Sequence, residues 1–121
     1  MNLRINPDSI RFRLDAQDYL ALCNHRSVVQ QTEFEFGLSI FYEVRYEDLP
    51  AQTVDNALHL QTDNSPEGLR WTLIVSPQAQ ALLATPNPSK EGVQDYQPTP
   101  NGGLLTIMLE RDMDHQRNAK R

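Results

Sequence analysis

The sequence predicts an α+β domain, in which about six mostly antiparallel strands form one curled sheet or a partly open barrel with two short helices. Three observations support this fold class. Several stretches alternate between apolar and polar side chains, as half-buried strands do. Two short stretches have helical spacing behind a capping residue. The order strand, helix, strand over residues 9–36 recurs over residues 69–110, as a similarity of pattern rather than of residues.

The length of the chain, 121 residues, fits one domain with one core. Its hydrophobic content of 39% and charged content of 22% are those of a folded rather than a disordered chain. We therefore expect a single α+β domain over residues 1–121. Residues 112–121 are polar, and we expect them to form a frayed tail.

The first quarter of the chain predicts two strands and a helix. Residues 3–5 form a short alternating run, and residues 10–14 alternate between apolar and arginine side chains. The period changes at Asp15, which is a good N-cap because its carboxylate accepts a free N–H of the first turn. The helix then continues over residues 16–23 and must pack on the sheet to be stable. Asn24 is expected to take the left-handed conformation that ends it.

Two long strands are predicted next. Residues 28–36 and 38–46 each alternate, and the glycine between them indicates a tight hairpin or a glycine bulge. In such a hairpin Glu33 or Glu35 is expected to pair with Arg45 across the strands, a surface pair worth only about 0–1 kcal/mol.

The second half predicts another hairpin, a helix and a final strand. Residues 58–62 and 69–75 alternate, and Ser76-Pro77 begins a helix that ends near Ala84. Residues 104–109 are apolar on both parities, which is typical of a central strand covered on both faces. The segment 86–103, with four prolines and three glycines, is expected to be a long loop. It is either a binding loop or a tolerated insertion, and we favour the insertion.

The charge of the chain bears on its partners. The formal net charge is −5 and the sequence pI is about 5.0. Residues 1–14 carry a net charge of +2, whereas residues 15–63 carry −7. Such an acidic middle repels phosphate backbones, so nucleic acid is an unexpected partner. We expect instead an unknown protein or small-molecule partner.

The compartment is predicted from the cysteine content and the hydropathy. The single cysteine, Cys23, cannot form an internal disulfide, which fits a reducing cytosol. The chain does not begin with a signal segment, and no apolar stretch approaches the roughly 20 residues of a membrane helix. We therefore expect a soluble cytoplasmic protein that does not interact with a membrane.

Two groups of residues are candidates for binding. Arg11 and Arg13, with Arg4 nearby, form a basic group suited to a carboxylate or phosphate. The alternative, which we favour, is that these arginines pair with the acidic side chains of residues 33–48. The second group is the segment 110–115, in which three carboxylates and an imidazole could bind a cation. A solvated strand end has the same composition, and we favour that explanation.

Catalytic and cofactor motifs are not found in the sequence. No two of the three histidines, at positions 25, 59 and 115, have the close spacing of a preformed metal site. We predict three separate surface residues, with residue 59 on the wet face of a strand. Cys23 is expected to belong to the core rather than to act as a nucleophile. Nucleotide-binding and hydrolase motifs do not occur. We therefore expect no metal and no cofactor, and the catalytic residues, if any, are unknown.

The two ends of the chain resemble a small family of uncharacterised bacterial proteins. The resemblance rests on the opening Leu-Arg-Ile-Asn-Pro-Asp-Ser-Ile-Arg-Phe-Arg-Leu, the helix that follows, and the ending Leu-Leu-Thr-Ile-Met-Leu-Glu-Arg-Asp. Members end with a Glu-Lys-Asp-Phe-like segment, which here is the run of residues 110–113. Their ending often continues into a Cys-Leu-containing stretch, from which Asp114-His115 departs. The resemblance implies a bacterial origin and carries over no functional residue.

Two hypotheses about function follow. The first is a non-enzymatic binding or accessory protein that uses an exposed sheet face or the loop 86–103, with a homodimer through an edge strand as one possibility. The rival is a small enzyme or metal-binding protein that uses the segment 110–115 beside the basic group. The residues that we single out for binding are Arg11, Arg13, Arg45, Glu110, Asp112 and His115. A third hypothesis, specific nucleic-acid binding through the arginine strand, predicts salt-dependent retention on an oligonucleotide column.

Overall fold

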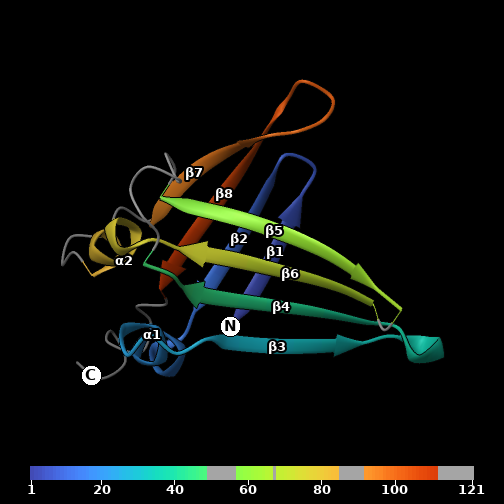
Figure 1. Cartoon of the computed structure of the whole chain (residues 1–121), viewed down its shortest axis with the longest axis horizontal. Coiled ribbons are helices and arrows are strands. Elements are labelled where there is room, and N and C mark those ends of the chain that lie inside the picture. The colour runs from blue at the N-terminus through green and yellow to red at the C-terminus, as the bar shows by residue number, and fades with distance from the viewer. Residues whose placement is uncertain (49–56, 67, 85–91, 112–121) are drawn as a thin grey trace, which may run out of the picture.

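The computed structural model describes residues 1–48, 57–66, 68–84 and 92–111 (Figure 1). Within these ranges the elements follow in the order β1 (Asn2–Asn6), β2 (Ser9–Leu14), α1 (Ala16–Cys23), β3 (Val28–Glu33), η1 (Glu35–Gly37), β4 (Ser39–Tyr46), β5 (Leu58–Ser65), β6 (Gly68–Val75), α2 (Pro77–Leu83), β7 (Val93–Pro98) and β8 (Leu104–Arg111). The 3-10 turn η1 joins β3 and β4. The expected fraying of residues 112–121 concerns residues outside the described ranges.

The strands form two four-stranded sheets rather than one. Sheet A has the order β1-β2-β8-β7, and sheet B has the order β3-β4-β6-β5. In each sheet the central pair is parallel and the outer pairs are antiparallel. The structure is broadly α+β with two helices, but the prediction of about six mostly antiparallel strands in one curled sheet or partly open barrel is wrong. Alternation reveals that a strand has one buried face, and it does not reveal to which sheet the strand belongs.

One strand lies where the sequence predicted only a loop. β7 pairs with β8 along its whole length, inside the segment 86–103. Its sequence, Val-Gln-Asp-Tyr-Gln-Pro, has few apolar residues, so the alternation of a half-buried strand is missing. Its proline stands at the last position of an edge strand, where a missing N–H costs little.

The topology contains a two-fold repeat that the residues do not show. Each half of the chain runs hairpin, helix, hairpin, and each sheet takes one hairpin from each half. The registers correspond as well. Phe12 of β2 lies opposite Leu109 of β8, and Leu73 of β6 lies opposite Val44 of β4. The similarity of pattern between residues 9–36 and 69–110 therefore reflects part of a repeated architecture.

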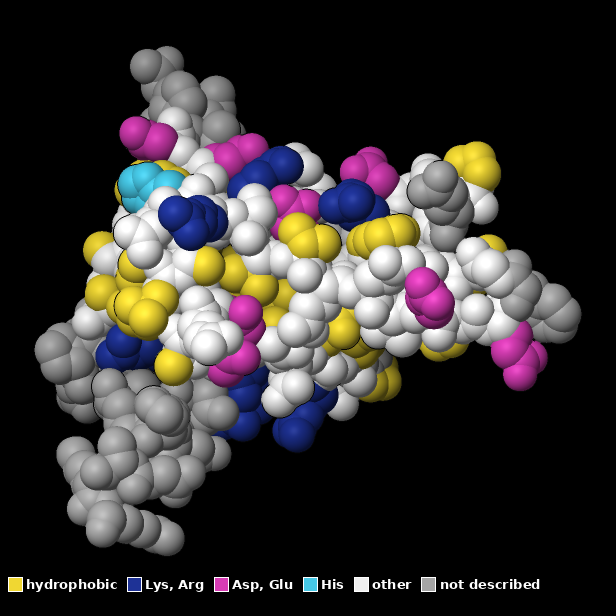
Figure 2. Space-filling model, turned by 90° about the horizontal axis from the view of Figure 1, so that it is seen from below, with side chains coloured by type: hydrophobic (Ala, Val, Ile, Leu, Met, Phe, Trp, Pro, Cys, Tyr) yellow, Lys and Arg dark blue, Asp and Glu magenta, His cyan; other side chains and the backbone are white. Residues whose placement is uncertain are grey.

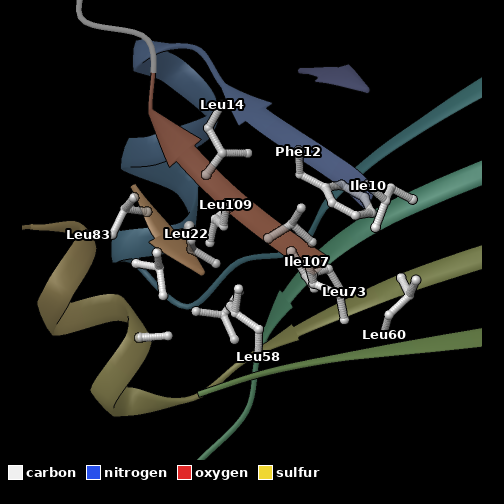
Figure 3. Close-up of a cluster of buried hydrophobic side chains, with 14 residues drawn as sticks. Ile10, Phe12, Leu14, Leu22, Leu58, Leu60, Leu73, Leu83, Ile107 and Leu109 are labelled. Carbon is white, nitrogen blue, oxygen red and sulfur yellow. The ribbon is translucent and has the colours of Figure 1, made fainter. Parts of the chain in front are cut away.

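The hydrophobic core lies between the inner faces of the two sheets and is closed at one end by the helices (Figure 3). Phe12, Leu73 and Leu109 are fully buried there, on alternate positions of their strands. Leu22 of α1 and Leu83 of α2 point into the same cluster (Figure 3). Helices this short gain their stability from such packing rather than from propensity.

β8 is the central strand that its apolar sequence predicted. It lies between β2 and β7, and four successive residues, 107–110, are buried. A strand covered on one face only would bury alternate residues, so both faces of β8 are covered. The predicted central strand is confirmed, but of residues 104–109 only the last three are buried, and Leu104 is 60% exposed.

The C-terminus of α1 uses an unexpected residue. Asn24 has φ −92°, and His25 takes the left-handed conformation with φ 58°. His25 N–H donates to Leu22 O at 2.9 Å, and Arg26 N–H donates to Ala21 O at 2.9 Å. These two bonds form a Schellman motif, in which the left-handed residue lies one position after the cap. The left-handed residue that ends the helix is therefore His25, one position after the predicted Asn24.

Both helix N-caps are those that the sequence predicted. Asp15 Oδ1 accepts from the N–H of Asp18 at 2.8 Å, and Ser76 Oγ accepts from the N–H of Ala79 at 3.1 Å. The hydrogen bond from Asp18 N–H lowers the pKa of the Asp15 carboxyl below its ordinary value of 3.8. The carboxylate form of Asp15 is therefore favoured by folding.

We expect Asp15→Ala to lower the free energy of unfolding by about 1 kcal/mol at pH 7. Because the folded pKa is depressed, this contribution is present above pH 3.8 and is lost as the pH falls through the folded pKa. Urea unfolding of both proteins between pH 2 and pH 7 measures the difference. Ser76→Ala is the matched control, since its cap is neutral and its cost should not depend on pH. A cost of Asp15→Ala that stays constant down to pH 2 contradicts the prediction.

The hairpin between β3 and β4 is antiparallel, as expected. Its connection is the turn η1, where Gly37 has φ 76° and Phe34 N–H donates to Leu38 O at 2.7 Å. A side chain at position 37 would be strained in this left-handed conformation. The glycine in the sequence therefore marked the turn correctly.

Side chains rather than a strand ladder join the two sheets at the edge between β5 and β7. Asp95 Oδ2 accepts from the N–H of Leu58 at 3.1 Å. The Gln97 amide accepts from Leu60 N–H and donates to Leu60 O, each at 3.1 Å. Polar side chains of β7 thus satisfy backbone groups of β5 that would otherwise lack partners.

The opposite edge has the corresponding arrangement. Gln30 of β3, with its amide oriented to satisfy both partners, donates to Met1 O at 2.8 Å and accepts from the Met1 amino group at 3.0 Å. Here too a side chain, rather than a ladder of backbone hydrogen bonds, joins sheet B to the segment that leads into β1. The described strands therefore form no closed barrel.

Candidate functional site

The outer face of sheet A carries the basic group that the sequence predicted. Arg11 and Arg13 alternate with the buried side chains of β2 and therefore point away from the core. Glu110 of the neighbouring strand β8 lies between them. Its Oε1 is 3.1 Å from Arg13 Nε, and its Oε2 is 4.0 Å from Arg11 Nε. The Glu110 side chain is only 8% exposed, so the arginines enclose it.

Two further residues complete this surface. Arg4 of β1 is opposite Arg11, and among the described residues it makes no ion pair. Arg11 Nη2 lies 3.7 Å from the sulfur of Met108, which is on β8. We call Arg4, Arg11, Arg13, Met108 and Glu110 the arginine face. The arginine face therefore carries three guanidinium groups and, among the described residues, one carboxylate, which pairs with Arg11 and Arg13 only.

The expected partners of these arginines are not the observed ones. We favoured pairing with the acidic side chains of residues 33–48, but those side chains lie in or beside sheet B. Arg11 and Arg13 pair instead with Glu110, because β2 and β8 are parallel neighbours. Sequence alone gave no reason to place β8 beside β2, since strand order is a property of the whole fold.

Arg45 lies on the outer face of sheet B, in a network of its own. Its Nη2 is 3.0 Å from Glu47 Oε1, and its Nη1 is 4.0 Å from Glu43 Oε2. Arg70 Nη1 donates to Glu43 Oε1 at 3.0 Å. Glu43 is buried beneath the two arginines, as Glu110 is on the other sheet. Along the upper edge of Figure 2, where sheet B lies, arginine and acidic side chains are mixed, whereas a group of arginines lies along the lower edge on the side of sheet A.

The expected pairing of Arg45 with Glu33 or Glu35 is wrong. The register of the hairpin places Glu33 opposite Ser39, at the far end of β4 from Arg45. Glu35 lies in the turn η1, still further away. The hairpin was predicted correctly, but the cross-strand pair requires the register, which the turn fixes.

Three of the six predicted binding residues are brought together: Arg11, Arg13 and Glu110. The fourth, Arg45, lies on β4 and belongs to sheet B. The remaining two, Asp112 and His115, lie outside the described residues. The segment 110–115 is therefore described only as far as Arg111.

The histidines in the described ranges do not meet. His25 stacks on Tyr46, with ring centroids 3.9 Å apart and an angle of 7° between the planes. His59 is exposed on β5, as its place on the wet face predicted. In residues 1–48, 57–66, 68–84 and 92–111, no three His, Cys, Asp or Glu side chains are grouped to hold a metal ion.

Cys23 does not belong to the core, contrary to expectation. Its side chain is exposed, and Leu22 takes the buried position on α1. The adjacent phenol of Tyr19 has a raised pKa, first because the ring is partly buried and then because of a hydrogen bond with Cys23. The Arg111 guanidinium lies 4.6 Å from the centroid of the Tyr19 ring. Helical spacing allowed either Leu22 or Cys23 to face the core, and the larger apolar side chain occupies it.

A second surface feature, at the tip of the β3–β4 hairpin, was not found from the sequence. It is a hollow of about 310 Å³ on the outer face of sheet B, which we call the tip hollow. It is lined by Gln31, Glu33, Phe34, Gly37, Ser39 and Phe41. The acidic and aromatic pair Glu33-Phe34, just before the turn η1, was the signal that could have indicated an exposed aromatic surface.

Comparison with known proteins gives one match. Residues 1–120 match the profile of the Family of unknown function (DUF7009). The chain belongs to this family. No curated protein and no solved structure matches the chain. The expected membership in a family of unknown function is confirmed, and the DUF7009 match extends over nearly the whole chain rather than over its two ends.

The helices of this DUF7009 chain are short. The longer of the two helices in the described ranges, α1, has eight residues. Within the described residues, no helix has the length and apolar character that are needed to cross a membrane.

Proposed function

We propose that this DUF7009 protein is a binding protein that docks an acidic segment of a partner protein on the arginine face. One observation carries the proposal: Arg11 and Arg13 both lie against the single buried carboxylate of Glu110, and Arg4, which has no ion pair among the described residues, lies opposite Arg11 on the same face. The surface therefore has a local positive charge on a chain whose net charge is −5. Such charge complementarity selects a partner and speeds its association.

The geometry of the arginines supports anion binding. Glu110 holds the Arg13 guanidinium at 3.1 Å and lies 4.0 Å from Arg11 Nε, while the Arg11 and Arg13 side chains stay 33% and 45% exposed. Arg11 Nε is buried and has no hydrogen-bond partner within the described chain. Guanidinium groups that are already held lose less entropy on binding, and their planar fork matches a carboxylate.

The acidic remainder of the chain favours a short acidic segment over a nucleic acid. Charges on a protein surface act over a Debye length of about 8 Å at physiological salt. An acidic segment of a few residues stays over the arginine face, within that distance. A nucleic acid extends beyond it, toward surfaces that carry most of the 16 acidic residues.

The rival function, metal binding or catalysis around Glu110, has weaker support. Glu110 does lie beside Arg11 and Arg13, as that hypothesis required. However, its carboxylate is already bound to Arg13 at 3.1 Å, and such a carboxylate is a poor ligand for a cation. We therefore favour binding over catalysis.

We further propose that the protein acts in the cytoplasm of a bacterium. The free thiol of Cys23 is exposed, which suits a reducing compartment. The bacterial origin rests on the resemblance of the two ends of the chain.

Binding of an eight-residue glutamate peptide tests the proposed function. We expect saturable binding by isothermal titration calorimetry that weakens as salt is raised. Arg4→Glu should weaken it about tenfold, since removal and reversal of one exposed charge is worth about 1.4 kcal/mol. Arg4 is the residue to change because no ion pair among the described residues depends on it.

Arg26→Glu is the matched control, since it makes the same charge change at an exposed residue after α1. An eight-residue glutamine peptide controls for uncharged contacts. Equal loss of affinity in the two variants, or equal binding of the two peptides, overturns the proposed function.

A further inference from the structure

We infer that the tip hollow binds a basic side chain, arginine or lysine, of a partner chain. The hollow is separate from the arginine face, because it lies on the outer face of the other sheet. It sits at the end of the β3–β4 hairpin, at the right-hand end of Figure 1. The inference is therefore independent of the proposed function.

The protein itself holds a guanidinium group beside the hollow in the way that we propose. Arg70 of β6 lies over Phe41, with its guanidinium carbon 5.0 Å from the ring centroid. The same guanidinium donates to Glu43 Oε1 at 3.0 Å. An aromatic ring and a carboxylate, both on the outer face of β4, together bind this cation.

The tip hollow repeats this pair of groups without a cation. Phe34 supplies an aromatic ring and Glu33 supplies a carboxylate. Glu33 forms no ion pair among the described residues, and its Oε1 receives only the Gln31 amide, at 3.4 Å. The other face of the hollow is Phe41, whose ring already binds Arg70. The hollow therefore has the same two kinds of group, an aromatic ring and a carboxylate, that bind Arg70 on β4, and it has them closer to the turn η1.

The polar lining of the hollow offers acceptors for a cation. The Gln31 amide nitrogen donates to Ser39 Oγ at 3.0 Å, which fixes the orientation of the amide. The same nitrogen lies 3.4 Å from Glu33 Oε1, and the amide carbonyl oxygen makes no hydrogen bond among the described residues. A guanidinium or ammonium group is donor only and matches this set. No lining residue is cationic, and the Arg70 guanidinium over Phe41 is already paired with Glu43.

The rim of the hollow favours a side chain over a free ion. Phe34 and Leu38 are 54% and 53% exposed at the tip. Arginine and lysine place an apolar stem against such surface and a charged head against acceptors. A bare metal ion would instead need six or so oxygen ligands. The volume of about 310 Å³ is at the lower end of the range for ligand pockets and suits a single side chain.

Titration with N-acetyl-arginine amide tests the inference by NMR. We expect saturable shifts of backbone amides in residues 31–41, with a dissociation constant in the millimolar range, as befits one cation–π contact and one exposed ion pair. N-acetyl-citrulline amide, which has nearly the same shape without the charge, should cause much smaller shifts. Equal shifts with the two probes, or shifts that do not saturate, overturn the inference.

Two variants with the same change of charge locate the site. Glu33→Gln should weaken binding of the arginine probe about threefold, from the loss of one exposed ion pair. Glu35→Gln, in the turn but not in the lining, should leave it unchanged. An equal effect of both variants assigns the binding to the general acidity of the tip and overturns the inference. Arg4→Glu serves to separate the two proposals, because it should weaken the glutamate peptide and leave the arginine probe unaffected.

Discussion

Phe12→Ala is expected to lower the free energy of unfolding by about 3–5 kcal/mol. Phe12 has no exposed surface and sits on β2 among the inner side chains of both sheets (Figure 3). Its removal loses the transfer free energy of a phenyl ring and leaves a cavity. The rigid flanking strands β1 and β8 limit collapse into this cavity. Urea unfolding monitored by circular dichroism measures the change.

The same substitution at an exposed position provides the control. Phe34 is 54% exposed, so Phe34→Ala should cost no more than about 1 kcal/mol. The two-fold repeat adds a second comparison. Leu73 occupies on β6 the position that Phe12 has on β2, and Leu73→Ala should cost about 2–5 kcal/mol. A cost of Phe12→Ala close to that of Phe34→Ala contradicts this picture of the core.

Gly68→Ala is expected to lower the free energy of unfolding by about 2–5 kcal/mol, although it adds only one methyl group. Gly68 begins β6 with φ 140° and lies beside Ser39 at the start of the parallel strand β4. A methyl group at position 68 would overlap the backbone carbonyl of Ser39. Because the obstacle is backbone and not a flexible side chain, the two strands must separate to admit it. Thermal and urea unfolding both report the loss.

Gly102→Ala separates the overlap from the backbone strain. Gly102 has φ 83°, and a methyl group there would meet no atom within 4 Å. Only the cost of a left-handed alanine remains, about 1–2 kcal/mol. If Gly68→Ala is no more destabilising than Gly102→Ala, the close approach of β4 and β6 does not limit this position.

Features that depend on neighbouring residues were predictable from the sequence. The caps at Asp15 and Ser76 follow from side-chain chemistry within one turn of helix. The β3–β4 hairpin follows from two alternating runs around Gly37. The central place of β8 follows from its continuous apolar run, because only a strand covered on both faces needs one.

Features that depend on strand order were not predictable in the same way. Alternation is identical for a strand of either sheet, so nothing local separated sheet A from sheet B. β7 lacked an apolar face because its side chains Asp95 and Gln97 serve as hydrogen-bond partners of β5. The candidate site shows the same division. Arg11, Arg13 and Glu110 were each identified from the sequence, but the favoured partners of the arginines were residues 33–48, and their pairing with Glu110 follows from the parallel neighbours β2 and β8. The tip hollow could not be predicted because it depends on the shape of the turn η1.

The exchange of hairpins between the two sheets has a consequence for synthesis of the chain. Residues 1–48 contain β1–β2 and β3–β4, which belong to different sheets. The parallel neighbours of both hairpins, β8 and β6, are in the other half of the chain. A two-stranded hairpin alone is at best marginally stable in water. Neither sheet can therefore be completed before strands of the second half have left the ribosome, and until then the apolar strands of residues 1–48 lack their parallel neighbours.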